Sequence, residues 1–128
     1  MGKSVHDNVL DSALNYVKNN AHRIAVCKAE PTTKALACQV LTGGYCLAWT
    51  GIATAGYTVG NGDTSGRKVA VAQKANVSVA CTGTATHVAI FSVAGNLLLY
   101  VTTCTTQVLT KGNTVTIPTW DIELRDPS

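Results

Sequence analysis

The stretch that decides the fold is THVAIFSVAGNLLLYVTT, residues 86–103. Two apolar segments, 87–93 and 97–103, flank the tripeptide Ala94-Gly95-Asn96. Glycine and asparagine tolerate positive φ angles, so the tripeptide predicts a turn and the segments predict the two strands of a β-hairpin. Because both segments are apolar on each face, we expect the hairpin to lie centrally, covered on both sides by the domain or by a partner chain.

The residues around the hairpin also favour strands. Threonine and valine are abundant there, and their branched β-carbons suit a pleated surface better than a helix. The predicted strands are 23–28, 46–50, 67–73, 77–82, 86–93, 97–103 and 114–124. Residues 32–45 have no regular pattern, and residues 51–66 are expected to form a long loop. The chain is therefore predicted to be mainly β, folded as an antiparallel β-sandwich or barrel.

One helix is predicted, at about residues 7–20. Apolar residues recur there at three- and four-residue intervals, at Val9, Leu10, Ala13, Leu14 and Val17. Asp7 or Asn8 is a suitable N-cap, and Asn19-Asn20 ends the pattern. We predict an amphipathic helical arm on one β-rich domain that spans residues 1–128.

The last predicted strand changes phase at Pro118-Thr119. Val115 and Ile117 share one parity, whereas Trp120, Ile122 and Leu124 share the other. Proline cannot donate a ladder hydrogen bond and is confined to edges or bulges. A β-bulge of one extra residue at Pro118 would keep both apolar sets on the core face.

Composition narrows the possible functions. The chain has 128 residues, of which 13% are charged and 46% hydrophobic, and this excludes a disordered charged tail. Its net charge of +3 comes from basic residues that do not form runs, so we expect no specific nucleic-acid partner. No segment approaches the roughly 18 apolar residues of a membrane span. Residues 1–12 lack the pattern of a secretory signal, so we expect no membrane partner.

The sequence offers no catalytic or metal-binding motif. Five cysteines occur without a C-x-x-C pair, at Cys27, Cys38, Cys46, Cys81 and Cys104, and are expected to act as small buried hydrophobic residues. The glycine-rich stretch 60–68 does not fit the phosphate-loop spacing and is interpreted as a turn. His87, in an apolar strand, is expected to be a hydrogen-bonded structural residue. Asp121 and Glu123 share one strand face, about 7 Å apart, where a solvated surface explains them. We therefore expect no enzyme, catalytic residue, cofactor or metal.

Five segments of the chain carry a resemblance: 6–21, 24–33, 61–69, 82–89 and 120–127. They resemble small virion structural proteins of tailed bacteriophages. The resemblance implies a protein of the virion, assembled in the cytoplasm of the bacterial host. Few charges and a hairpin that is apolar on both faces fit the same expectation, because such surfaces are covered by copies of the chain or by a larger partner.

The expected function is that of a capsid decoration or cement protein. Its partners would be the major capsid protein or another virion protein, together with self-association. The helix at 7–20 and the final segment 120–128 are the expected contact regions, through Leu10, Leu14, Val17, Trp120, Ile122 and Leu124. A neck or tail ring component of the particle is the alternative. A carbohydrate- or receptor-binding module is less favoured, because the aromatic residues are few and scattered.

Overall fold

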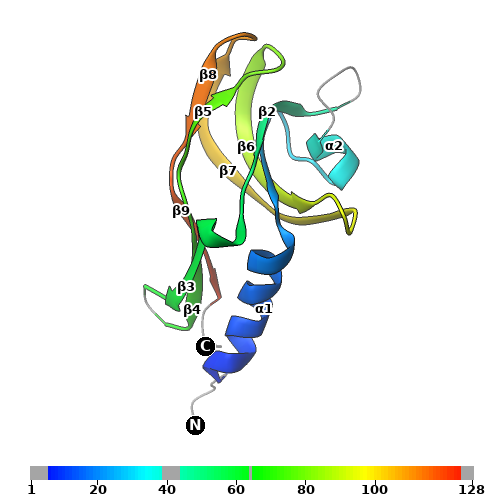
Figure 1. Ribbon diagram of the computed structural model, residues 1–128. Coiled ribbons are helices and arrows are strands. Elements are labelled where there is room, and N and C mark those ends of the chain that lie inside the picture. Colours follow the sequence, from blue (N-terminus) through cyan, green and yellow to red (C-terminus); the bar gives the residue numbers. More distant parts are fainter. Residues whose placement is uncertain (1–5, 39–43, 64, 125–128) are drawn as a thin grey trace.

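A computed structural model describes residues 6–38, 44–63 and 65–124 and contains an N-terminal helix followed mainly by strands (Figure 1). The elements are α1 (Asp7–Asn20), β1 (Arg23–Cys27), α2 (Lys34–Cys38), β2 (Cys46–Gly51), a 3-10 turn (Thr54–Gly56), β3 (Tyr57–Asn61), β4 (Arg67–Val71), β5 (Lys74–Ser78), β6 (Gly83–Ser92), β7 (Leu97–Leu109), β8 (Thr114–Ile117) and β9 (Trp120–Leu124). Every strand pair is antiparallel. The predicted mainly β fold with an N-terminal helix is confirmed, and the described strands form separate sheets instead of a closed barrel.

The predicted hairpin forms one side of the largest sheet, whose strand order is β2-β1-β6-β7. β6 pairs with β7, and Asn96 in the connecting turn has a φ of 55°, as the turn prediction requires. β6 lies inside the sheet and its residues 88–92 are buried. β7 lies at the sheet edge, and only its last residue, Leu109, is buried. The central position was therefore correct for β6, which pairs with β1 and β7, and wrong for β7, because no described strand pairs with its outer edge.

The main core lies between this four-stranded sheet and two smaller sheets, with strand orders β3-β4-β9 and β5-β8. At β2 the four-stranded sheet is joined to the segment that follows β5: Ala48 pairs with Val79, and the Ala80 N–H donates to the Leu47 carbonyl at 2.8 Å. Helix α1 has the predicted bounds and closes the end of this core beside β3 and β4 (Figure 1). Its N-cap is His6, whose Nδ1 accepts the Asn8 N–H at 3.1 Å, instead of the predicted Asp7 or Asn8.

A second, smaller core lies on the opposite face of the four-stranded sheet. Helix α2 packs there against β1, β2 and β6. The buried residues of this second core are Ala25, Cys27, Ala37, Cys46, Ala89 and Phe91. β1 and β6 are thus covered on both faces by this chain itself, which explains why both read as continuous apolar segments.

The phase change at Pro118-Thr119 has a different cause from the predicted bulge. Val71 pairs with Trp120, and Lys74 pairs with Ile117. These two pairs are three residues apart on each strand, so neither strand contains an extra residue between them. Residues 72–73 and 118–119 are instead left out of the ladder, and at this interruption both strands turn the other set of alternating side chains towards the core. The register shift lies nearby, between Lys74 and Val77. The predicted bulge at Pro118 is therefore wrong.

At this interruption the Thr119 hydroxyl donates to the Val71 carbonyl at 2.7 Å. Thr119→Val keeps the side-chain shape and removes this bond, so we expect the free energy of unfolding to fall by about 1 kcal/mol. Urea denaturation measures the change. Thr116→Val is the matched control, because Thr116 is exposed on neighbouring β8. Equal effects of the two substitutions would show that the hydroxyl bond does not stabilise the interruption.

Three elements lie in stretches for which no helix or strand was predicted, namely α2, the 3-10 turn Thr54–Gly56 and β3. β3, within the expected loop 51–66, pairs with β4 from Tyr57 opposite Val71 to Asn61 opposite Arg67. α2 lies within residues 32–45, and the Leu36 N–H donates to the Thr33 hydroxyl at 3.2 Å. The prediction for residues 51–66 was wrong at β3, because tertiary pairing with β4 overrides the glycine-rich sequence.

Candidate functional site

The residues expected to contact partners lie in the core of this chain. Leu10, Leu14 and Ile122 are buried, and Val17, Trp120 and Leu124 pack partly buried against the same core. α1 lies on the wall formed by β3 and β4, and β9 pairs with β4 in that wall. Arg67 joins helix to sheet, since its Nε donates to Asp11 Oδ1 at 2.8 Å. Partner contact through the six predicted residues stays a prediction.

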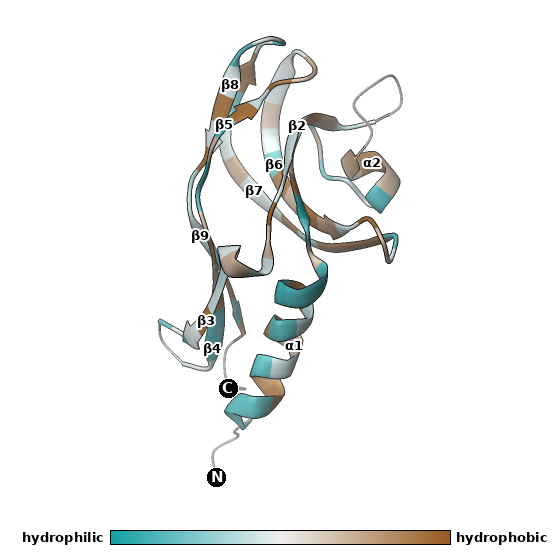
Figure 2. Ribbon diagram, in the orientation of Figure 1, coloured by the Kyte–Doolittle hydropathy of each residue, from teal (hydrophilic) through white to brown (hydrophobic). Residues whose placement is uncertain are grey.

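The face of the four-stranded sheet that carries α2 has a second group of apolar residues. The strand registers place Trp49, Ala25, Ala89 and Val101 in one row, and Arg23, Phe91 and Leu98 in the next. We call these seven residues the α2-side face. The five-residue helix covers it only in part, since Trp49 is 41% exposed while Leu98 and Val101 are half-buried. Figure 2 shows the apolar colouring of β6 and β7 continuing to their hairpin end.

The α2-side face carries a single charge. The Arg23 guanidinium lies over the Trp49 ring, 4.2 Å from its centroid, in a cation–π contact. At the hairpin end, Val93 and Leu97 are 45% and 44% exposed, but Leu97 pairs with Ser92 and therefore lies on the other face of the sheet from Phe91. Exposed and half-buried apolar groups that share one side of a β-sheet, as Trp49, Leu98 and Val101 do, are typical of a protein–protein contact surface.

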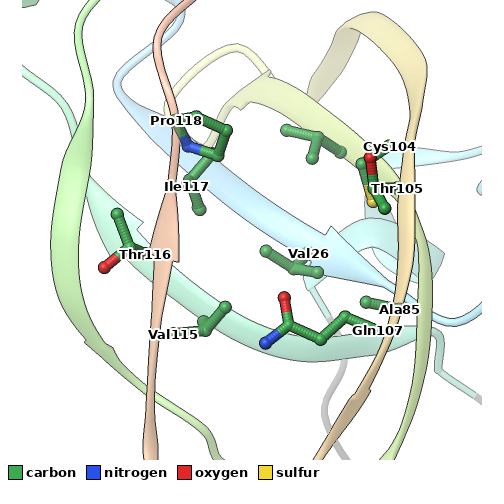
Figure 3. A pocket seen from close by; sticks show the side chains of 10 residues that line it. Val26, Ala85, Cys104, Thr105, Gln107, Val115, Thr116, Ile117 and Pro118 are labelled. Carbon is green, nitrogen blue, oxygen red and sulfur yellow. The ribbon is translucent and has the colours of Figure 1, made fainter.

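A seam separates β7 from β8 on the side of the molecule opposite the β2 junction. It contains a hollow of about 300 Å³ (Figure 3). The hollow is lined by Val26, Ala85, Val88, Cys104, Thr105, Gln107, Val115, Thr116, Ile117 and Pro118. No carboxylate, amine or imidazole is among these residues, so the hollow offers space for an apolar group but no acid–base pair.

An adjacent hollow of about 320 Å³ shares Val88, Cys104 and Pro118 with the first and extends to Trp120 and Asp121. Trp120 stacks on Tyr100 with ring centroids 5.7 Å apart. The Trp120 Nε1 is buried and has no hydrogen-bond partner among the described residues. Burial also raises the pKa of the Cys104 thiol, which keeps it protonated and weakly nucleophilic.

The turn between β3 and β4 uses its charges for internal contacts. Lys68 Nζ donates to Asp63 Oδ1 at 2.7 Å and to Asp121 Oδ2 at 3.3 Å, and these bonds raise the pKa of Lys68. Glu123 Oε1 accepts the Asp63 N–H at 2.9 Å. Asp121 and Glu123 therefore hold the turn. Of the stretch 60–68 that was interpreted as a turn, residues 62, 63, 65 and 66 lie between the strands, whereas residues 60–61 belong to β3 and residues 67–68 to β4.

The remaining chemistry-bearing side chains are separated. His87 Nδ1 lies 2.8 Å from the Thr86 hydroxyl, consistent with the predicted hydrogen-bonded role. Cys27 and Cys46 are buried as predicted, whereas Cys38, Cys81 and Cys104 are only half-buried. Over residues 6–38, 44–63 and 65–124, no three or more His, Cys, Asp or Glu residues gather in a group that could hold a metal ion. Within the same ranges, no helix is long and apolar enough to cross a membrane.

The α2-side face could not be recognised from the sequence. Trp49 and Leu98 are far apart in the chain, and only the registers of β1 with β2 and β6, and of β6 with β7, bring them to one face. The seam hollow likewise depends on the separation of β7 from β8. Comparisons with known proteins find no matching protein family, no matching curated protein and no matching solved structure.

Proposed function

We propose that this chain is a non-enzymatic structural protein of a bacteriophage virion, a capsid decoration or cement protein that bridges and stabilises capsid subunits. The observation that carries the proposal is the α2-side face, an apolar sheet surface that α2 covers only in part. The resemblance of five chain segments to phage virion proteins supports it independently. The major capsid protein is the proposed partner, together with further copies of this chain.

Binding through this face would stabilise an assembled head by mass action. A ligand that binds the assembled lattice and not its separated subunits shifts the equilibrium towards the lattice. Each square ångström of apolar surface removed from water contributes about 25 cal/mol. A sheet face suits this role because its backbone is already ordered, so little conformational entropy is lost on binding.

Bridging requires a second surface, and α1 supplies a candidate. Val9 and Tyr16 are 62% and 50% exposed and lie seven residues apart, which places them on the same side of the helix. Leu10 and Leu14 point into the core. We propose that the Val9 and Tyr16 side contacts a second subunit while the α2-side face contacts the first.

The copy number on purified particles tests this proposal. A cement protein is expected in many copies per head, and heads that lack it should lose their DNA at a lower temperature. About a dozen copies or fewer would instead indicate a neck or tail ring. Heads with unchanged thermal stability after removal of the protein would contradict the cement function.

A substitution on the α2-side face tests the surface itself. Trp49→Glu places a carboxylate where an apolar contact is proposed, so binding to heads that lack the protein should weaken at least about tenfold. Thr58→Glu is the matched control, since Thr58 is exposed on β3, in another sheet. Circular dichroism establishes that both variants are folded. Equal binding of the two variants would exclude the α2-side face as the contact surface.

A further inference from the structure

Cys27 and Cys46 lie directly opposite each other in the adjacent antiparallel strands β1 and β2. We infer that these two cysteines form a cross-strand disulfide when the folded protein meets an oxidising disulfide compound such as oxidised glutathione. The inference concerns a covalent modification site and does not depend on the proposed role in a virion.

The register places the two cysteines in the narrow type of antiparallel pair. The Lys28 N–H donates to the Tyr45 carbonyl at 3.0 Å, so Lys28 and Tyr45 face each other at a hydrogen-bonded position. Hydrogen-bonded and non-hydrogen-bonded pairs alternate, and Cys27 and Cys46 are the next pair along. The Cα atoms of a non-hydrogen-bonded pair are about 4.5 Å apart, within the roughly 4.4–6.8 Å range that disulfides span.

Both thiols also belong to the same buried cluster beneath α2. Cys27 is 0% and Cys46 is 1% exposed, and their neighbours in that cluster are small or aromatic apolar residues. Cys38, on α2, packs against the same cluster, and the Cys38 and Cys46 thiols each donate to a nearby backbone carbonyl at 3.6 Å, of Ala35 and of Ala48. Cys46 is the favoured partner of Cys27 because the strand pairing holds these two side by side, on the Lys28 side of the register shift that lies between Val26 and Cys27.

Burial controls when the disulfide forms. It raises the pKa of Cys27 and the pKa of Cys46 to about 12, so both thiols are protonated at neutral pH. The thiolate is the attacking species in thiol–disulfide exchange. Oxidation of the closed structure is consequently slow, and we expect it to speed up under conditions that loosen the five-residue helix α2 and admit solvent to the two thiols.

The chemistry balances by two successive exchanges. One cysteine loses its proton, and its thiolate attacks the sulfur–sulfur bond of oxidised glutathione, which gives a mixed disulfide and releases one glutathione thiolate. The second cysteine, deprotonated in turn, attacks the protein sulfur of the mixed disulfide and releases the second glutathione. In total the two cysteines lose two electrons and two protons, and the oxidised glutathione takes these up and becomes two molecules of glutathione thiol.

Non-reducing peptide mapping of the full chain tests the inference. Reduced protein is incubated with excess oxidised glutathione, in buffer and in mild urea that opens α2, and then digested. We expect a linkage between Cys27 and Cys46, formed faster in mild urea, in the wild type and in Cys38→Ser. The thermal midpoint should rise by about 5 °C and return on treatment with a phosphine reductant, because the cross-link restricts the unfolded chain.

The controls separate this pair from the other thiols. Cys104→Ala should keep the linkage and the thermal shift, whereas Cys27→Ala should lose both. If Cys27→Ala does not fold, the map of the wild type still decides the question. A linkage of Cys27 or Cys46 to Cys38, or glutathione adducts without any Cys27–Cys46 linkage in mild urea, would overturn the inference.

Discussion

Leu14→Ala is expected to lower the free energy of unfolding by about 3 kcal/mol, within the range seen for a buried leucine that leaves a cavity. Leu14 is 1% exposed and belongs to the main core, where α1 closes the space beside β3 and β4. Truncation removes apolar contacts that the β-sheet backbone cannot refill by moving inwards. The loss is measured by urea denaturation followed by circular dichroism.

Val9→Ala in the same helix is the control for this prediction. Val9 is 62% exposed, so its truncation leaves no cavity, and alanine has the higher helix propensity. We expect a change of less than about 0.5 kcal/mol. Similar losses for the two variants would mean that α1 does not close the core through Leu14.

Gly62→Ala should destabilise the turn between β3 and β4 by about 2 kcal/mol, through overpacking. A β-carbon at Gly62 would meet the backbone carbonyl of Ser65, and would lie 2.6 Å from Glu123 Oε1. The Gly62 N–H donates to the Gly66 carbonyl at 3.0 Å, so the clash cannot be relieved without straining the turn. The midpoint of thermal unfolding reports the loss.

Gly60→Ala, two residues earlier on β3, is the matched substitution. A β-carbon there meets no atom of the described part of the chain within 4 Å, so alanine adds no clash. It also restricts the unfolded chain, and the variant should be as stable as the wild type or slightly more stable. A loss at Gly60 equal to that at Gly62 would refute the steric explanation.

The parts of the fold that the sequence predicts correctly are those with a local cause. α1 follows from apolar spacing, and the β6–β7 hairpin follows from Ala94-Gly95-Asn96 between two apolar segments. β3 is hidden by its glycine-rich sequence although its partner β4 follows directly in the chain, whereas the simultaneous change of face at Pro118 depends on a distant partner, Ala72-Gln73. A pattern within one segment holds no information about such partners.

The expected contact residues show the same limit. The spacing of Leu10, Leu14 and Ile122 predicts an apolar face, but it does not distinguish a face buried in the chain's own core from one buried against a partner. In the structure β3, β4 and the core beside them cover it. The exposed apolar residue Trp49 carries no periodic signal, and its place on the α2-side face becomes clear only when the strand registers and the size of α2 are known.

The double interruption opposite Pro118 also has a mechanical consequence. Val71 pairs with Trp120 and Lys74 pairs with Ile117, so the strands keep one register across the interruption, while residues 72–73 and 118–119 between these pairs contribute no ladder pair that would resist bending. Pro118 lines both hollows of the seam. Bending at this interruption would widen or narrow the gap between β7 and β8.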